Sequence, residues 1–195
     1  AVTDEQRRRD SRDIMGIGER RTANTLAINS NQRAVNAFVA DPDVYPMNAA
    51  AIWSSSSSSA ISDIFAAASL INNNYMGYVA DTVLLTPTTA LKLQNNTALY
   101  AGMPRENVAL NPLLQPAGRL NGLAGLNWVI SPKALANAVI VMQRGIVGGI
   151  ATEVPIHADV VDDRKTQQTF VITSHLDVPL ITDPKAAVII TGVNS

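Results

Sequence analysis

Two apolar runs, each of which stops at a proline, constrain the fold of this chain most strongly. Within residues 79–87, the segment from Thr82 to Thr86 reads as a strand with a continuous apolar run, and Thr86-Pro87 reads as a helix start. A continuous apolar run predicts a strand that is buried on both faces, and a proline at a first helical position predicts a helix there, which we expect to end near Gln94. Residues 122–132 read as a glycine-containing turn, then a short buried strand that stops at Pro132.

The N-terminal part of the chain predicts one long helix over residues 4–39. Thr3 and Gln6 have the spacing of a capping box, and Asp41-Pro42 is a stop signal. The apolar residues at three- and four-residue spacing form a narrow, alanine-rich stripe: Ala23, Leu26, Ala27, Ala34, Ala37 and Phe38. Such a helix needs another element along its flank, because its own stripe is too small to form a core.

The remaining sequence predicts a mixture of helices and strands. In order, it favours a loop over 41–59, a helix over 60–73, an irregular segment over 95–118, a strand over 138–142, two long strands over 150–161 and 166–176, and a final strand over 187–191. The polar turn Asp162-Asp163-Arg164-Lys165 joins the two long strands into an antiparallel hairpin. We expect its apolar residues, Val154, Ile156, Val160, Val171 and Ile172, to pack in part on the helix stripe at Leu26, Ala27 and Ala34.

Composition excludes several classes of function. Only 16% of the 195 residues are charged, against a typical share of roughly 25%, so much of the surface is easily desolvated against a partner. The net charge of −1 argues against an electrostatic grip on nucleic acid, which needs a clustered basic face. The absence of cysteine removes disulfides and thiolate sites. No apolar run approaches the roughly 18 residues of a membrane span, and we expect no membrane partner.

The ordered set of elements resembles the major capsid proteins of tailed double-stranded DNA phages, which have the Hong Kong 97-type fold. The segments 79–87 and 122–132 carry this resemblance at their observed separation. The start Val2-Thr3-Asp4-Glu5-Gln6-Arg7-Arg8-Arg9, with Thr22-Ala23-Asn24-Thr25-Leu26 beyond it, looks like the spine helix of actinobacteriophage capsid proteins. Family members carry an N-terminal arm and a long extended loop before the spine helix, and we expect both to be absent from these 195 residues.

The resemblance implies an α+β fold with two domains. A peripheral domain, residues 1–45 and 150–182, would hold the spine helix packed on the long antiparallel hairpin. An axial domain, residues 46–149 and 183–195, would hold a central mixed sheet with flanking helices.

The resemblance also implies the function and its partners. The chain would be a structural subunit, not an enzyme, that assembles with copies of itself into the hexamers and pentamers of an icosahedral capsid. The capsid would enclose double-stranded DNA without sequence-specific contacts, and scaffold, portal and decoration proteins are further expected partners. The protein would reside in the virion after assembly in the bacterial host cytoplasm. The alternative within the same fold is the shell protein of an encapsulin-type bacterial nanocompartment.

Few residues suggest chemistry. His157 and His175 lie on the two arms of the predicted hairpin, with Asp159 and Asp177 nearby in sequence, but a solvated strand face explains them better than a metal or acid–base site. We therefore expect no catalytic, cofactor or metal residues. A small hydrolase that depends on His157 and a monomeric binding module are the alternatives from other classes.

One cluster of arginines is the candidate subunit interface: Arg7, Arg8, Arg9, Arg12, Arg20 and Arg21. Acidic residues interleave with this cluster, which indicates ion pairing within the helix and between subunits more than binding to DNA. We expect carboxylates or helix C-termini of adjacent subunits as its partners.

Overall fold

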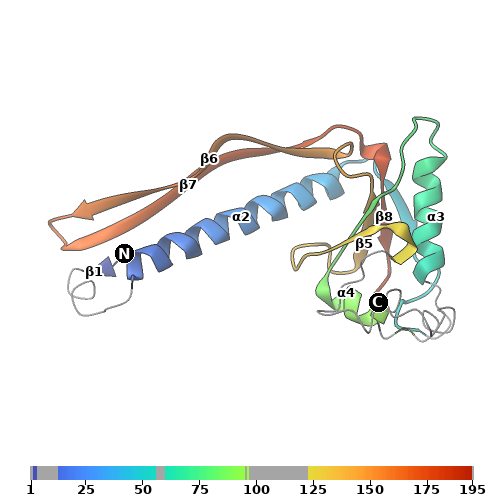
Figure 1. The fold of residues 1–195 in the computed structure, drawn as a ribbon, viewed down its shortest axis with the longest axis horizontal. Coiled ribbons are helices and arrows are strands. Elements are labelled where there is room, and N and C mark those ends of the chain that lie inside the picture. The colour runs from blue at the N-terminus through green and yellow to red at the C-terminus, as the bar shows by residue number, and fades with distance from the viewer. Residues whose placement is uncertain (1, 4–12, 56–59, 95, 97–122, 195) are drawn as a thin grey trace. The chain divides into compact units, whose positions relative to one another are not determined.

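The computed structural model describes residues 2–3, 13–55, 60–94, 96 and 123–194, and the chain divides into two compact units (Figure 1). The helix–hairpin unit comprises Ala1–Ala34 and Ile150–Pro179, and the sheet unit comprises Val35–Gly149 and Leu180–Ser195. The chain passes from one unit to the other within long elements, because the helix and both hairpin strands contribute residues to each.

The helix–hairpin unit consists of one long helix beside a long two-stranded ribbon. Helix α2 (Ile14–Ala40) runs along strands β6 (Gly148–Asp163) and β7 (Gln168–Ile181) (Figure 1). Strand β1 (Val2–Thr3) pairs antiparallel with the start of β7, which gives the strand order β1-β7-β6. The predicted antiparallel hairpin and its polar turn are thus present, and the turn is held by the Asp163 carboxylate, which accepts bonds from Lys165 N and Thr166 Oγ1.

The predicted helix does not run unbroken through residue 13. Thr3 lies in β1, where it pairs with Gln168, and residues 4–12, on which the predicted cap at Thr3 depends, lie outside the described residues. Helix α2 begins at Ile14, and the Asp13 carboxylate accepts a hydrogen bond of 3.0 Å from Gly16 N. Asp13 therefore supplies a side-chain cap for α2 that the sequence pattern did not predict. Gln6 lies outside the described residues.

The sheet unit is built on a five-stranded mixed sheet in the order β2-β8-β5-β3-β4. The strands are β2 (Tyr45–Asn48), β3 (Thr82–Leu85), β4 (Asn127–Ile130), β5 (Ala138–Met142) and β8 (Ala187–Thr191). Strands β2 and β8 are parallel, as are β3 and β4, whereas β5 runs antiparallel to both of its neighbours. The helical elements that lie wholly within the described residues of this unit are α3 (Ala60–Asn72), α4 (Pro87–Gln94) and the 3-10 turns η3 (Leu123–Gly125) and η4 (Pro184–Ala186).

The core of the protein lies in this sheet unit. Helix α3 packs on β5 and β8, and its residues Ile64, Ala67 and Ile71 are completely buried. The central strands are apolar at consecutive positions and buried on both faces, as the sequence pattern of residues 82–86 predicted for β3. Strand β2 corrects the predicted loop over 41–59, because its proline-containing sequence pairs at an edge of the sheet, where a missing N–H is tolerated.

A buried carboxylate fixes the chain between β2 and α3. Trp53 is fully buried, and its Nε1 donates a hydrogen bond of 3.0 Å to Asp63 Oδ2. The other oxygen of Asp63 accepts a bond of 3.3 Å from Ala50 N. The acidic residue in the first turn of α3 thus orders the segment that precedes the helix.

Candidate assembly interface

The contact between α2 and β7 is polar. Thr22, Ser30 and Arg33 recur at helical spacing on one side of α2, and all three reach side chains of β7. The hydroxyls of Thr22 and Thr173 lie 2.8 Å apart. Ser30 Oγ and Arg33 Nη2 both donate to the carboxylate of Asp177.

Asp177 is the centre of this contact. Only 5% of the residue is exposed, and His175 Nε2 lies 3.3 Å from its Oδ2. The hydrogen bond from Ser30 lowers the pKa of Asp177, burial opposes this effect, and the charges of Arg33 and His175 lower the pKa further. A buried carboxylate is tolerated here because it is both hydrogen-bonded and paired.

The polarity of β7 is the reverse of that in a typical half-buried strand. The residues toward the helix include Thr169, Thr173, His175 and Asp177, which are buried or half-buried. The residues on the other face are mostly large and apolar, and they are exposed: Phe170, Ile172, Leu176 and Val178. We call this apolar row, together with the same face of β6, the outer face of the hairpin.

Part of the predicted packing is therefore wrong. Ile172 is 52% exposed and lies on the outer face, so it does not pack on the helix stripe. Val160 is likewise exposed, whereas Val154 and Val171 are half-buried. Hydrogen bonds and the Arg33–Asp177 ion pair occupy much of the contact that apolar packing was expected to fill.

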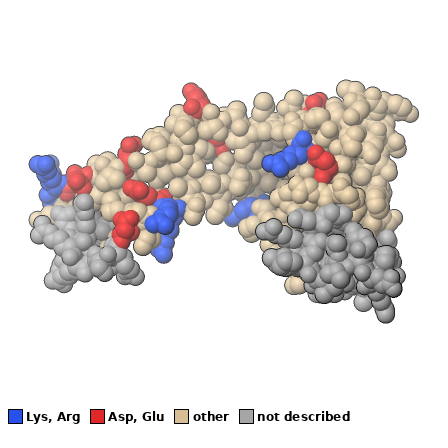
Figure 2. All heavy atoms as spheres, viewed as in Figure 1, with Lys and Arg blue, Asp and Glu red and all other residues tan. Residues whose placement is uncertain are grey.

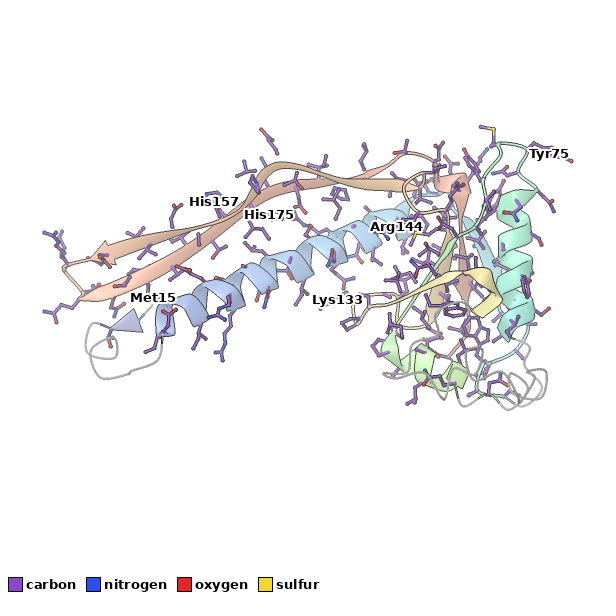
Figure 3. All side chains as sticks on the ribbon, viewed as in Figure 1. Met15, Tyr75, Lys133, Arg144, His157 and His175 are labelled. Carbon is purple, nitrogen blue, oxygen red and sulfur yellow. The ribbon has the colours of Figure 1, made fainter. Side chains whose placement is uncertain are left out.

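The two histidines, both labelled in Figure 3, come from the two strands of the hairpin, His157 from β6 and His175 from β7. His157 Nε2 is 2.9 Å from Ser174 Oγ, which lies on the outer face. His175 follows Ser174 in β7, so strand alternation places its side chain on the other face, where its Nε2 lies 3.3 Å from Asp177 Oδ2. No group of three or more potential metal ligands occurs among the described residues.

The group formed by His157, Ser174 and Asp159 does not have the geometry of a catalytic triad. His157 Nε2 faces Ser174 and lies 3.8 Å from Asp159 Oδ2, while Nδ1 faces Pro155 O at 3.2 Å. A triad needs the nucleophile and the carboxylate on different ring nitrogens, because one nitrogen takes the proton of the nucleophile while the carboxylate holds the N–H of the other nitrogen and so fixes the tautomer and the orientation of the ring. Here one nitrogen faces both groups, so the carboxylate cannot hold the tautomer that nucleophile activation requires.

The structure describes two members of the candidate arginine cluster. Arg20 and Arg21 are exposed on α2, and Arg20 Nε donates to Gly16 O in its own helix at 3.2 Å. Arg7, Arg8, Arg9 and Arg12 lie outside the described residues. On the face shown in Figure 2, most of the visible charged side chains belong to the helix–hairpin unit.

Ser30, Arg33 and Asp177 were not predicted as a group from the sequence. One signal for it was present, because every second residue from Thr169 to Asp177 is polar except Val171, whereas the residues between them are large and apolar except Ser174. The pattern shows that the two faces differ, but it does not show which face meets the helix.

Comparison with known proteins decides the family. A family model described as phage capsid protein matches residues 1–190. The chain belongs to the phage capsid protein family. No curated protein sequence matches this capsid protein.

Solved structures agree with the family in fold. The capsid of cyanophage P-SCSP1u matches with a TM-score of 0.72 at 16% identity, over 100% of this capsid protein and 70% of that chain. A chain of Mycobacterium phage Che8 matches with a TM-score of 0.69 at 14% identity, over 100% of this chain and 69% of that one. A virus-like particle from Pyrococcus furiosus matches with a TM-score of 0.59 at 13% identity, over 85% and 62% respectively.

These findings confirm the expected fold and general function. The protein has the Hong Kong 97-type α+β fold, with the mixed sheet and helices described above, and it is a structural subunit of a phage capsid. Within the part of the chain that the structure describes, no helix is long and apolar enough to cross a membrane.

Proposed function

We propose that this capsid protein assembles with copies of itself into hexamers and pentamers, which close into an icosahedral shell around a double-stranded DNA genome. The observation that carries the proposal is the match to the phage capsid family over residues 1–190. The low content of charged residues, 16%, supports it, because a weakly hydrated surface is desolvated at low cost in repeated contacts.

The two domains have separate roles in this proposal. The axial domain, residues 46–149 and 183–195, contributes contacts within each hexamer or pentamer. The peripheral domain, residues 1–45 and 150–182, contributes contacts between them. The separate compact units support such a division, since each can keep its own fold while the other adapts to its neighbours.

The DNA is enclosed without sequence-specific contacts. A net charge of −1 gives the subunit little general attraction to phosphates. Scaffold, portal and decoration proteins are the further partners of such a shell, and assembly takes place in the bacterial cytoplasm before the protein becomes part of the virion. We assign the protein no enzymatic role, and the arrangement around His157 supports this assignment.

The family match favours a phage shell over the nanocompartment shell that is the main alternative. The experiment is to express the full-length protein in a bacterial host with and without its phage partners, purify particles by sedimentation, and image them by electron microscopy. We expect closed icosahedral particles with hexamers and pentamers, which contain double-stranded DNA when the packaging proteins are present. Particles that always contain a cargo protein and never DNA would support the nanocompartment, and a small monodisperse species under all conditions would contradict both.

A further inference from the structure

The outer face of the hairpin combines an apolar row with an acidic row. The apolar row belongs to β7 and consists of Phe170, Ile172, Leu176 and Val178, of which Val178 is 59% exposed. The contact between His157 and Ser174 shows that His157 shares this face. Asp159 Oδ2 lies 3.8 Å from His157 Nε2, so Asp159 also lies on the outer face. Strand alternation places Glu153 on this face as well. Both carboxylates are exposed.

The outer face of α2 has the opposite charge. We define it as the side of the helix that points away from Thr22 and Ser30. Ile17, Arg21 and Ile28 recur there at spacings of four and seven residues, and Arg20 lies beside them. All four residues are exposed. Among the described residues, no carboxylate forms an ion pair with Arg20 or Arg21.

We propose that the outer face of the hairpin in one subunit packs against the outer face of α2 in a second copy of this chain. The two faces match in chemistry, because each combines large aliphatic side chains with charges, acidic on the hairpin and basic on the helix. This inference rests on the proposed function, since only a self-assembling subunit meets copies of itself in a fixed orientation.

The charges also argue against packaged DNA as the partner of the outer face of the hairpin. The acidic row of Glu153 and Asp159 repels the phosphates of packaged DNA, so the apolar row beside it is not a DNA-facing surface. A contact between two different faces of the same chain is heterologous, and such contacts generate rings when the rotation between subunits closes. The apolar rows supply most of the attraction, and the charges select the register and the partner.

The test is an exchange of charges in the full-length protein. Reversal of the helix pair, Arg20→Glu with Arg21→Glu, should lower the yield of particles at least about tenfold. Reversal of the hairpin pair, Glu153→Lys with Asp159→Lys, should do the same. Combination of all four changes should restore most of the yield, because each face then carries the charge of the other and the net charge of the subunit is that of the parent.

A second combination controls for net charge alone. Arg164 and Lys165 lie in the hairpin turn and belong to neither face. The variant with Arg164→Glu, Lys165→Glu, Glu153→Lys and Asp159→Lys has the same net charge as the exchanged variant, but it should remain defective. Circular dichroism and thermal melting should show that every variant keeps a folded subunit.

A further pair of changes tests the apolar row without any charge. Ile172→Thr and Val178→Thr keep a β-branched side chain, so the hairpin should still form, whereas particle yield should fall. Two results would overturn the inference, provided that the parent forms particles. One is a normal particle yield from either reversed pair or from the threonine pair. The other is a particle yield of the exchanged variant that is no higher than that of the variant with the changes at Arg164 and Lys165. Failure of the parent itself to form any particle would instead overturn the proposed function, and the inference with it.

Discussion

The carboxylate of Asp177 on β7 accepts a hydrogen bond from the hydroxyl of Ser30 on α2, and both residues are buried. Arg33 of the same helix donates to the other carboxylate oxygen. The helix and the hairpin are therefore joined by directional bonds at one place. Because these bonds fix register more than apolar contact does, a change at Asp177 should loosen this contact without affecting the sheet unit.

Asp177→Asn should destabilise the helix–hairpin unit. The side-chain amide has one acceptor oxygen in place of two and no negative charge, so it loses the ion pair with Arg33 and can accept from only one of the two present donors, Ser30 and Arg33. Hydrogen exchange is the measurement, and amides of α2 and β7 near residues 30 and 177 should exchange faster than in the parent. Asp159→Asn is the control, because the Asp159 side chain is 67% exposed, and it should leave these rates unchanged. Equal protection in parent and Asp177→Asn would show that this carboxylate does not hold the contact.

The contribution of Asp177 should depend on pH. The pKa of Asp177 is lowered in the folded protein, first by the bond from Ser30 and then by the charges of Arg33 and His175, so the unfolded chain binds the proton more tightly. The stabilisation is therefore complete well above the ordinary aspartate pKa of about 3.9, and it is lost as the pH falls through the lower folded value. Melting of the parent and of Asp177→Asn over a pH series should show a constant difference near neutral pH that shrinks under acid conditions. A difference that persists or widens at the lowest pH would contradict this assignment.

The elements of the fold could be predicted from the sequence better than the contacts between them could. The apolar runs that end at Pro87 and Pro132 led to the strands β3 and β4, because apolar runs and proline stops are local features of the chain. The predicted burial of the second strand was wrong, since β4 lies at an end of the sheet order and only Trp128 of its four residues is buried. Strand β2 was missed because Tyr45–Asn48 has little strand propensity of its own and contains a proline. Its structure comes from pairing with β8, which lies far along the chain.

The helix–hairpin contact was predicted as a pairing of elements but not in its chemistry. Alternation in β7 identifies two faces, and ordinary hydrophobic reasoning turns the apolar one toward the helix. In the structure Asp177 faces the helix and Ile172 faces away. This choice of face depends on what covers the other side, and a single subunit sequence does not contain that information.

Asp63→Ala should destabilise the sheet unit by about 1–3 kcal/mol, because it leaves the buried Trp53 N–H without its acceptor. Urea denaturation followed by tryptophan fluorescence measures this directly, since Trp53 and Trp128 are both buried in this unit. Asp63→Asn should be milder, because one amide oxygen still accepts from the indole. Asp43→Ala, at an exposed position, should have little effect. If Asp63→Ala unfolds at the same urea concentration as the parent, the Trp53 bond contributes nothing to stability.

Gly148→Ala should destabilise the protein where β6 begins, whereas Gly149→Ala should not. A Cβ atom on Gly148 would overlap the backbone carbonyl oxygen of Leu180 and crowd the Cα of Ile181 at 3.1 Å. The two backbones are held together at this point, because Thr182 N donates a bond of 2.9 Å to Val147 O. Neither backbone can move aside freely, so the extra methyl group should cost about 1–3 kcal/mol, as is usual for overpacking.

The neighbouring glycine provides a matched control. A Cβ on Gly149 meets no atom within 4 Å, so Gly149→Ala should stay within about 0.5 kcal/mol of the parent. Both variants add the same single methyl group to the same strand, and urea denaturation followed by tryptophan fluorescence compares them under one set of conditions. Only the close approach of Leu180 distinguishes the two positions, so equal stability of the two variants would show that the backbones at the start of β6 are not packed as closely as the structure has them.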